Sequence, residues 1–161
     1  MHPHAVALIE KLQLLPHPEG GFYREIFRSS SAVHTADGRT TRCALTTIYF
    51  LLPEGMHSRW HRVTSDEVWH LYEGGPLELW TAAPSLDSVE RVLLGPAGSS
   101  AGPVQTVPAG TWQAARALGH FALAGCTVGP GFEFADFSFL RDDRVALARL
   151  THLGGGFDLL A

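Results

Sequence analysis

The hydrophobic pattern of the chain begins with the period of a helix. In residues 1–15 the apolar side chains recur every three or four positions, at Ala5, Leu8, Ile9, Leu12 and Leu15. Glu10 and Lys11 fall on the opposite side. An apolar stripe at this spacing is typical of an amphipathic helix with one buried face. The pattern therefore predicts an N-terminal helix over residues 1–15.

Beyond this helix the period shortens to that of strands. In "LPHPEGG", Pro16 and Pro18 cannot continue a helix, and Gly20-Gly21 permits a sharp turn. Asp37-Gly38 is a strong hairpin signal. Short β-like runs then follow one another: "GFYREIFRS", "CALTTIYFLL", "SRWHRV", "EVWHLY", "PLELWTA", "RVLLG", "VQTVPAG", "TWQAARAL", "HFALAGCTV" and "FEFADFSFL". Dense short strands broken by glycine and proline predict an all-β sandwich or barrel over about residues 20–140.

The end of the chain returns to a helical pattern. "DDRVALARLTHL" predicts a short closing helix with Asp142 or Asp143 as its N-cap. No linker or low-complexity tract divides the sequence, so we expect residues 1–161 to form one domain.

Composition narrows the functional classes. A hydrophobic fraction of 45% with 17% charged residues fits a globular protein. The net charge of −4 gives no basic footprint, so we expect neither a nucleic acid nor a membrane as partner. The N-terminus lacks the features of a signal peptide, and Cys43 and Cys126 are two lone thiols far apart in sequence. These features predict a cytoplasmic protein.

Candidate chemistry concentrates in residues 55–75, "GMHSRWHRVTSDEVWHLYEGG". Five residues separate Gly55 from His61, one separates His61 from Val63, three separate Val63 from Glu67, and six separate Glu67 from Gly74. This spacing resembles the first motif of the cupin superfamily, which is Gly, five residues, His-x-His, three or four residues, Glu, six residues, Gly.

A second stretch strengthens the resemblance. Gly102, five residues, Pro108-x-Gly110, two residues and Gln113 resembles the second cupin motif, which ends in His with Asn four positions later. Further stretches, "LPHPEGGFYRE", "WHRVTSDEVWH" and "GFEFADF", are similar to one branch of small RmlC-like cupins of uncharacterised function. The resemblance implies a double-stranded β-helix, or jelly-roll barrel, that forms a homodimer and has a pocket inside the barrel.

The departures from the motifs bear on a metal. A metal-binding cupin supplies three histidines and one glutamate, but here Val63 and Gln113 replace two of the histidines, and Ala117 stands in place of the asparagine. Valine cannot ligate, and a glutamine carbonyl is a weak donor for metals that imidazole suits. We therefore expect no cofactor. The alternative is a divalent metal ion held by a degenerate set of His61, Glu67 and Gln113.

We do not expect the neighbouring histidines to replace the missing metal ligands. Strand alternation puts His57, Arg59, His61 and Val63 on one face, although His57 can equally belong to a loop. His70 follows Glu67 by three residues, so a regular strand points it to the opposite face. We expect both His57 and His70 to be bystanders.

Three functions stay open. In the first, the protein binds a small, sugar-like molecule and carries out metal-free isomerase or epimerase chemistry, with His61 as base and Glu67 as its partner. In the second, it is a metal-dependent cupin enzyme, and in the third a ligand-binding or sensor module without catalysis. The fold cannot choose among them. The residues expected to contact the ligand are Gln113, Tyr49, Arg59, Trp112 and Phe134.

Overall fold

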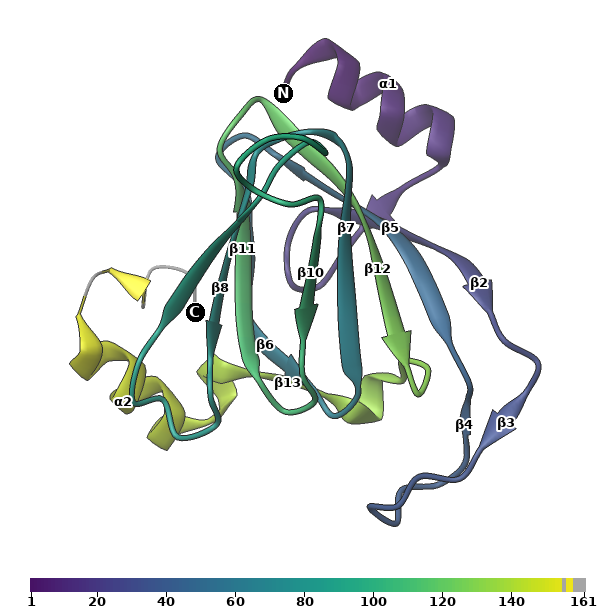
Figure 1. Ribbon diagram of the computed structural model, residues 1–161, viewed down its shortest axis with the longest axis vertical. Coiled ribbons are helices and arrows are strands. Elements are labelled where there is room, and N and C mark those ends of the chain that lie inside the picture. Colours follow the sequence, from purple (N-terminus) through teal and green to yellow (C-terminus); the bar gives the residue numbers. More distant parts are fainter. Residues whose placement is uncertain (155, 158–161) are drawn as a thin grey trace.

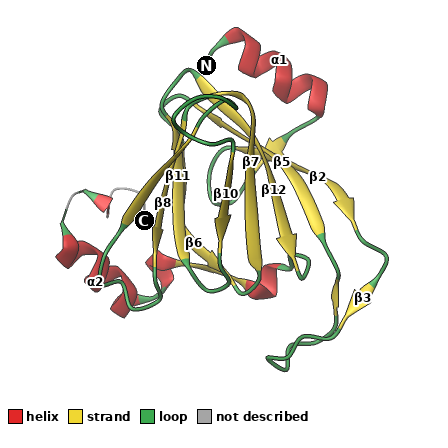
Figure 2. Ribbon diagram, in the orientation of Figure 1, coloured by secondary structure: helices red, strands yellow, loops and turns green. Residues whose placement is uncertain are grey.

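The computed structural model describes residues 1–154 and 156–157. Two α-helices flank a set of antiparallel strands (Figures 1 and 2). The helices are α1 (Pro3–Leu12) and α2 (Arg144–Leu153), and two short 3-10 turns are η1 (Phe134–Asp136) and η2 (Leu140–Asp142). The strands are β1 (Leu15–Pro16), β2 (Phe22–Arg28), β3 (Ala32–Val33), β4 (Arg42–Cys43), β5 (Thr46–Pro53), β6 (His57–Val63), β7 (Asp66–Gly74), β8 (Leu77–Ala82), β9 (Glu90–Leu94), β10 (Val104–Val107), β11 (Trp112–Ala117), β12 (Phe121–Gly129) and β13 (Phe137–Phe139).

Two sheets face each other and form the jelly-roll barrel that the strand pattern predicted. One has six strands in the order β1-β2-β5-β12-β7-β10, and the other has five in the order β13-β6-β11-β8-β9. Strands β3 and β4 pair separately as a hairpin around Asp37-Gly38, and Figure 1 shows this hairpin projecting beyond the barrel. The hairpin is held to the barrel by the buried ion pair between Arg42 and Asp136, with an Nε–Oδ2 distance of 2.8 Å.

The N-terminal helix is shorter than predicted. It ends at Leu12 because Gln13 adopts the left-handed conformation, and Leu15 and Pro16 already pair with β2. Ala5, Leu8 and Leu14 form an apolar cluster with side chains of β5 and β12. Helix α1 therefore covers part of the outer face of the six-stranded sheet.

The C-terminal helix begins as predicted. The side chain of Asp143 accepts hydrogen bonds from the backbone N–H groups of Val145 and Ala146, which makes it the N-cap. Leu150 packs with Trp60 and Trp112 in a second cluster. Helix α2 thus covers the outer face of the five-stranded sheet.

The barrel interior is divided between a solid core and a pocket. Around Phe50, Leu52 and Trp69 the two sheets are closed by apolar side chains, including Leu77, Leu79 and Leu94 from β8 and β9. Toward β13 and η1, polar side chains join apolar ones on the inner face, and a cavity remains. This division places the candidate site inside one end of the barrel.

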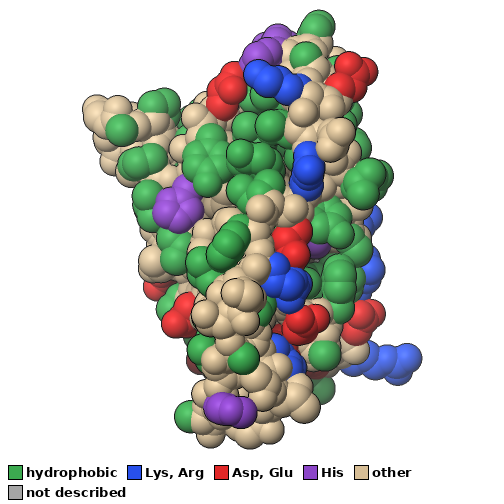
Figure 3. All heavy atoms as spheres, turned by 90° about the vertical axis from the view of Figure 1, so that its right-hand side faces the viewer, with side chains coloured by type: hydrophobic (Ala, Val, Ile, Leu, Met, Phe, Trp, Pro, Cys, Tyr) green, Lys and Arg blue, Asp and Glu red, His purple; other side chains and the backbone are tan. Residues whose placement is uncertain are grey.

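The surface over β2 mixes charged and hydrophobic side chains. On the face that carries β2, basic and acidic side chains are interleaved with hydrophobic ones (Figure 3). Ile26 and Phe27 of β2 are exposed. Within the described ranges, neither helix has the length and apolar character needed to cross a membrane.

Candidate functional site

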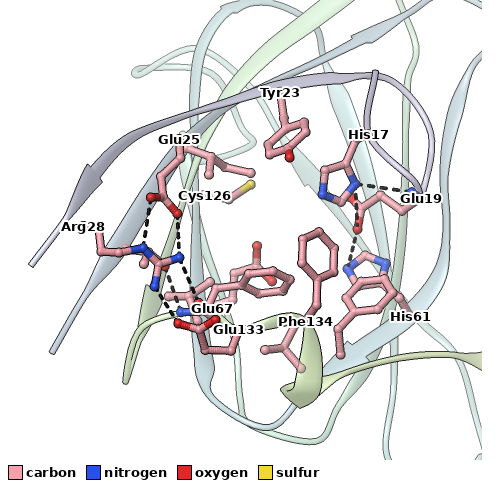
Figure 4. A pocket seen from close by; sticks show the side chains of 16 residues that line it. His17, Glu19, Tyr23, Glu25, Arg28, His61, Glu67, Cys126, Glu133 and Phe134 are labelled. Atoms are coloured by element: carbon pink, nitrogen blue, oxygen red, sulfur yellow. Dashed lines mark hydrogen bonds and ion pairs between the residues drawn. The ribbon is translucent and has the colours of Figure 1, made fainter. Parts of the chain in front are cut away.

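The candidate site is a cavity of about 300 Å³ inside the barrel. Its wall comes from β2, β5, β6, β7, β12, the loop before β2 and the segment of residues 132–137 (Figure 4). The lining residues are His17, Glu19, Tyr23, Glu25, Arg28, Thr46, Ile48, His61, Val63, Glu67, Cys126, Val128, Phe132, Glu133, Phe134 and Phe137.

His61 and Glu19 form a buried pair on one wall. Nδ1 of His61 lies 2.7 Å from the carbonyl oxygen of Arg59, so it carries the proton and donates, and Nε2 keeps its lone pair. Nε2 lies 3.3 Å from Oε2 of Glu19. Burial raises the pKa of Glu19 to about 8, against the hydrogen bond from Ser58, and burial also lowers the pKa of His61. Both shifts favour the uncharged forms, so at neutral pH the protonated carboxyl of Glu19 lies beside the lone pair of Nε2.

A chain of two hydrogen bonds holds Glu67 in the cavity wall formed by β7. The indole Nε1–H of Trp69 only donates, so the Gln113 atom 3.0 Å from it is the amide oxygen. The amide nitrogen of Gln113 then donates to Oε2 of Glu67 at 2.6 Å. Burial raises the pKa of Glu67, while His61 and Gln113 oppose that shift. Gln113 therefore orients Glu67 rather than facing the cavity itself.

His17 supplies a hydrogen-bond donor. Its Nδ1 accepts from the backbone N–H of Glu19 at 3.3 Å, and burial lowers the pKa of His17 to about 4. At neutral pH the ring is uncharged and its proton lies on Nε2, which is turned toward the hollow in Figure 4. Tyr23 packs edge-on against this ring, with centroids 4.4 Å apart, and its hydroxyl points into the same hollow (Figure 4).

A charged cluster closes the far side of the pocket. Arg28 binds both oxygens of Glu25, at 3.0 and 2.8 Å, and Oε1 of Glu133 at 2.7 Å. It also donates to the carbonyl oxygen of Phe132 at 3.2 Å. Since Glu25 and Arg28 belong to β2, these contacts tie β2 to the segment that carries Phe132, Phe134 and Phe137.

The sequence-predicted residues divide into two groups. His61, Glu67 and Phe134 line the cavity, and Gln113 supports it from behind. Tyr49 does not line it, because the neighbouring Ile48 points inward and Tyr49 packs against Tyr72 on the outer face. Trp112 also points outward, with Arg62 lying 4.4 Å over its ring.

Arg59 lies outside the cavity because of a bulge in β6. Gln113 pairs with His61, but Ala115 pairs with Ser58, so β6 contains one extra residue there. The extra residue turns Ser58 inward beside His61, where its hydroxyl donates to Oε1 of Glu19 at 3.0 Å. Arg59 instead donates its backbone N–H to Glu19 and its guanidinium to Pro18. Simple alternation, which put Arg59 on the His61 face, was wrong here.

The two other histidines of residues 55–75, His57 and His70, do not line the cavity. His57 is half-buried at the other end of β6 and is not among the lining residues. His70 lies on the opposite face of β7 from the buried Glu67 and Trp69. Their positions agree with the expectation that they are bystanders.

The donor set does not fit a divalent metal ion in the manner of the cupin motif. Val63 offers no ligand, the amide oxygen of Gln113 is occupied by Trp69, and Nε2 of His61 faces Glu19. Across residues 1–154 and 156–157, no three His, Cys, Asp or Glu side chains converge as a metal site would require. Instead, His61 lies against Glu19, and Gln113 binds Glu67.

The stretch "HPEGGFYREIFR" supplies more of the site than its sequence pattern predicted. It took "PHPEGG" for a turn, but this loop folds over β6 and places His17 and Glu19 in the site. Gly20 permits that approach, because its φ is +118° and an added Cβ would meet the carbonyl oxygen of His57 at 2.1 Å. The signal was the alternation of Tyr23 and Glu25 in β2. A bulge between Glu25 and Phe27 adds Arg28 to the same face.

The fold and the site together define a small jelly-roll protein with a buried acid–base cluster inside the barrel. The chain belongs to the Cupin superfamily (DUF985), whose family model matches residues 6–140. This confirms the resemblance that the two spaced motifs indicated.

Solved structures agree with this membership. A hypothetical protein from Leishmania major is 32% identical, with a TM-score of 0.81, over 97% of this chain and 95% of that one. A protein from Shewanella oneidensis is 31% identical, with a TM-score of 0.82, over 96% and 95%. The capsular polysaccharide assembling protein CapF from Staphylococcus aureus is 13% identical, with a TM-score of 0.58, over 78% and 33%, and shows the fold alone. No curated protein matches the chain.

Proposed function

We propose that the protein binds a small molecule inside the barrel and moves a proton on it without a metal, in the manner of an isomerase or epimerase. The observation that carries the proposal is the His61–Glu19 pair, which faces the same cavity as the buried carboxyl of Glu67. Perturbed acids and bases that share one cavity are typical of catalytic sites.

The two walls have complementary roles in this proposal. His61 and Glu19 share one proton. A ligand bound beside this pair can accept that proton, or it can transfer a second proton to the pair. Glu67, oriented by Gln113, is the second proton acceptor, and burial raises its pKa, which makes it a stronger base than an exposed carboxylate. A substrate proton removed at one wall can thus be replaced at the other.

The donors between these walls suit a developing oxyanion. Nε2–H of the uncharged His17 and the hydroxyl of Tyr23 both face the hollow (Figure 4). Donors aimed at an oxygen atom stabilise negative charge that builds up on it when a neighbouring C–H bond is broken. A substrate with a carbonyl group beside the reacting carbon would use His17 and Tyr23 together with the acid–base groups on the two walls.

The test begins with the ligand itself. Small molecules that copurify with the native protein would be identified by native mass spectrometry and returned to the protein in D₂O. We expect deuterium to enter one C–H position of the ligand, as followed by NMR. His61→Asn and Glu67→Gln should each slow this exchange by about 10² or more, the usual contribution of a general acid or base.

The matched control is Glu73→Gln. Glu73 lies on the same strand as Glu67 but is exposed and bonds to His4, so its loss should leave the exchange rate unchanged. Tight binding without exchange in the wild type would reduce the protein to a ligand-binding module. Stoichiometric metal in protein purified without chelator, lost in His61→Ala and Glu67→Ala, would refute the metal-free chemistry.

The homodimer and the cytoplasmic location stay predictions. Light scattering at several protein concentrations would measure the oligomeric state, and the exposed Ile26 and Phe27 on β2 make that face the first to probe.

A further inference from the structure

We infer that the ligand of the barrel pocket is a small organic cation, an amine protonated at neutral pH. The inference rests on the proposed function for the place of the ligand, and it adds the chemical class. It follows from the carboxyl groups, the single arginine, the aromatic wall and the size of the cavity.

Two buried carboxyl groups of the pocket have no lysine or arginine partner among the described residues. The side chain of Glu19 is 8% exposed, and among the described residues its ion-pair contacts are only to His17 and His61. The Glu67 residue is 6% exposed, and none of the ion pairs in the described part of the chain involves it. Burial disfavours the charged form of such a group, and a cation placed beside it favours ionisation. A cation brought by the ligand would provide that partner.

Arg28 cannot serve as an anion receptor. Its Nε–H and one NH2 hydrogen bind Glu25, one NH1 hydrogen binds Glu133, and the rest face the carbonyl oxygen of Phe132 and the sulfur of Cys43. All five guanidinium hydrogens are therefore engaged. Two carboxylates outweigh its single charge, and no other lysine or arginine lines the described pocket. A phosphate or carboxylate on the ligand would meet net negative charge.

The aromatic side chains complete a cation site. Phe132, Phe134 and Phe137 stand edge to face, with centroids 5.1 Å apart for Phe132–Phe134 and 6.4 Å for Phe134–Phe137. Tyr23 lies across the hollow from Phe134 (Figure 4). The faces of such rings carry negative potential and attract ammonium groups within about 6 Å. Phe134 is 57% exposed, so it stands at the mouth, where a ligand enters.

The volume limits the ligand. At about 30 Å³ for each water-sized group, 300 Å³ holds roughly ten non-hydrogen atoms. A nucleotide sugar exceeds this size and carries phosphates. An amine with a six-membered ring fits in both volume and charge.

Three probes with one carbon skeleton separate the classes: cyclohexylmethylamine, cyclohexylmethanol and cyclohexanecarboxylate. Isothermal titration calorimetry at neutral pH would measure each against the wild-type protein. We expect the amine to bind at least about tenfold more tightly than the alcohol, as a cation over aromatic rings and beside a buried carboxylate should. The carboxylate should bind more weakly than the alcohol.

Two variants tie that preference to the pocket. Glu67→Gln should lower the amine-to-alcohol affinity ratio toward one, and Glu73→Gln, which removes the same charge outside the pocket, should leave the ratio unchanged. Phe134→Leu alters an exposed ring that does not support the core, and it should lower the ratio without affecting folding.

Equal or tighter binding of the alcohol or the carboxylate would overturn the inference, and so would no binding of the amine at millimolar concentration. The proposed function fails by a different result. If the amine is preferred and deuterium exchange on the native ligand is absent, the ligand class stands and the catalysis does not.

Discussion

Glu19→Gln is the substitution that most directly tests the electrostatics of the site. Glutamine has the shape of a protonated glutamate. It can still accept from Ser58, whose hydroxyl lies 3.0 Å from Oε1, and it places an uncharged amide beside Nε2 of His61. The variant therefore mimics the form of Glu19 that predominates below pH 8, without its ability to ionise.

The expected magnitude follows from the pKa of Glu19, which burial raises from 4.5 to about 8. An acid whose pKa is higher in the folded state binds more protons there, so stability falls as pH rises above its unfolded value. The loss is about 1.4 kcal/mol for each pH unit between 4.5 and 8. From pH 5 to pH 8 the wild type should lose roughly 3 to 4 kcal/mol that the variant keeps.

Urea unfolding at pH 5, 6.5 and 8 would measure this difference. His17 works with the opposite sign, because its lowered pKa makes stability rise with pH from about 4 to 6.5, but it is present in both proteins and cancels. Glu10→Gln, on the exposed side of α1, measures the effect of removing a carboxyl group away from the pocket. A free-energy difference between wild type and Glu19→Gln that stays constant with pH would refute the assignment of Glu19 as a buried neutral acid.

Three further substitutions test the framework of the site. Gln113→Leu leaves Trp69 Nε1–H and Glu67 without their hydrogen-bond partner. It should reduce the free energy of unfolding, measured by denaturant titration, by about 2 to 4 kcal/mol. A loss below about 1 kcal/mol would contradict that hydrogen-bond chain. Gly20→Ala should strain the loop against β6 and slow the proposed proton exchange through displacement of Glu19, while an unchanged rate would show that the loop adapts freely. Asp136→Asn breaks the buried ion pair with Arg42 and should lower the free energy of unfolding by about 3 to 5 kcal/mol, measured by thermal unfolding. The loss should be largest at neutral pH. Arg42 lowers the pKa of Asp136, and protonation of Asp136 in acid removes the same ion pair from the wild type.

Local pattern determined much of the architecture. The change from a helical to a strand period, the Asp37-Gly38 hairpin and the Asp143 cap depend on neighbours in sequence. The hairpin and the cap lie where they were predicted, and the helix ends at Leu12, within the predicted segment. The motif spacing also placed His61 and Glu67 in the barrel, because a strand of fixed rise carries side chains inward at regular intervals.

Tertiary structure decided what those residues can do. Two bulges, in β2 and β6, shift the inward face by one residue, so Arg28 enters the pocket and Arg59 leaves it. Such register changes depend on the partner strands rather than on the strand itself.

The chemistry of the site was decided across still longer distances. Glu19 meets His61 only because the Gly20 loop folds back over β6, and Gln113 turns its oxygen away from the cavity because Trp69 of the opposite sheet donates to it. Sequence alone identified His61 and Glu67 as acid–base candidates. The sequence predicted Glu67 as the partner of His61. Only the packing of segments distant in sequence showed that Glu19 lies against Nε2 of His61 instead, since such contacts exist only once the sheets have closed.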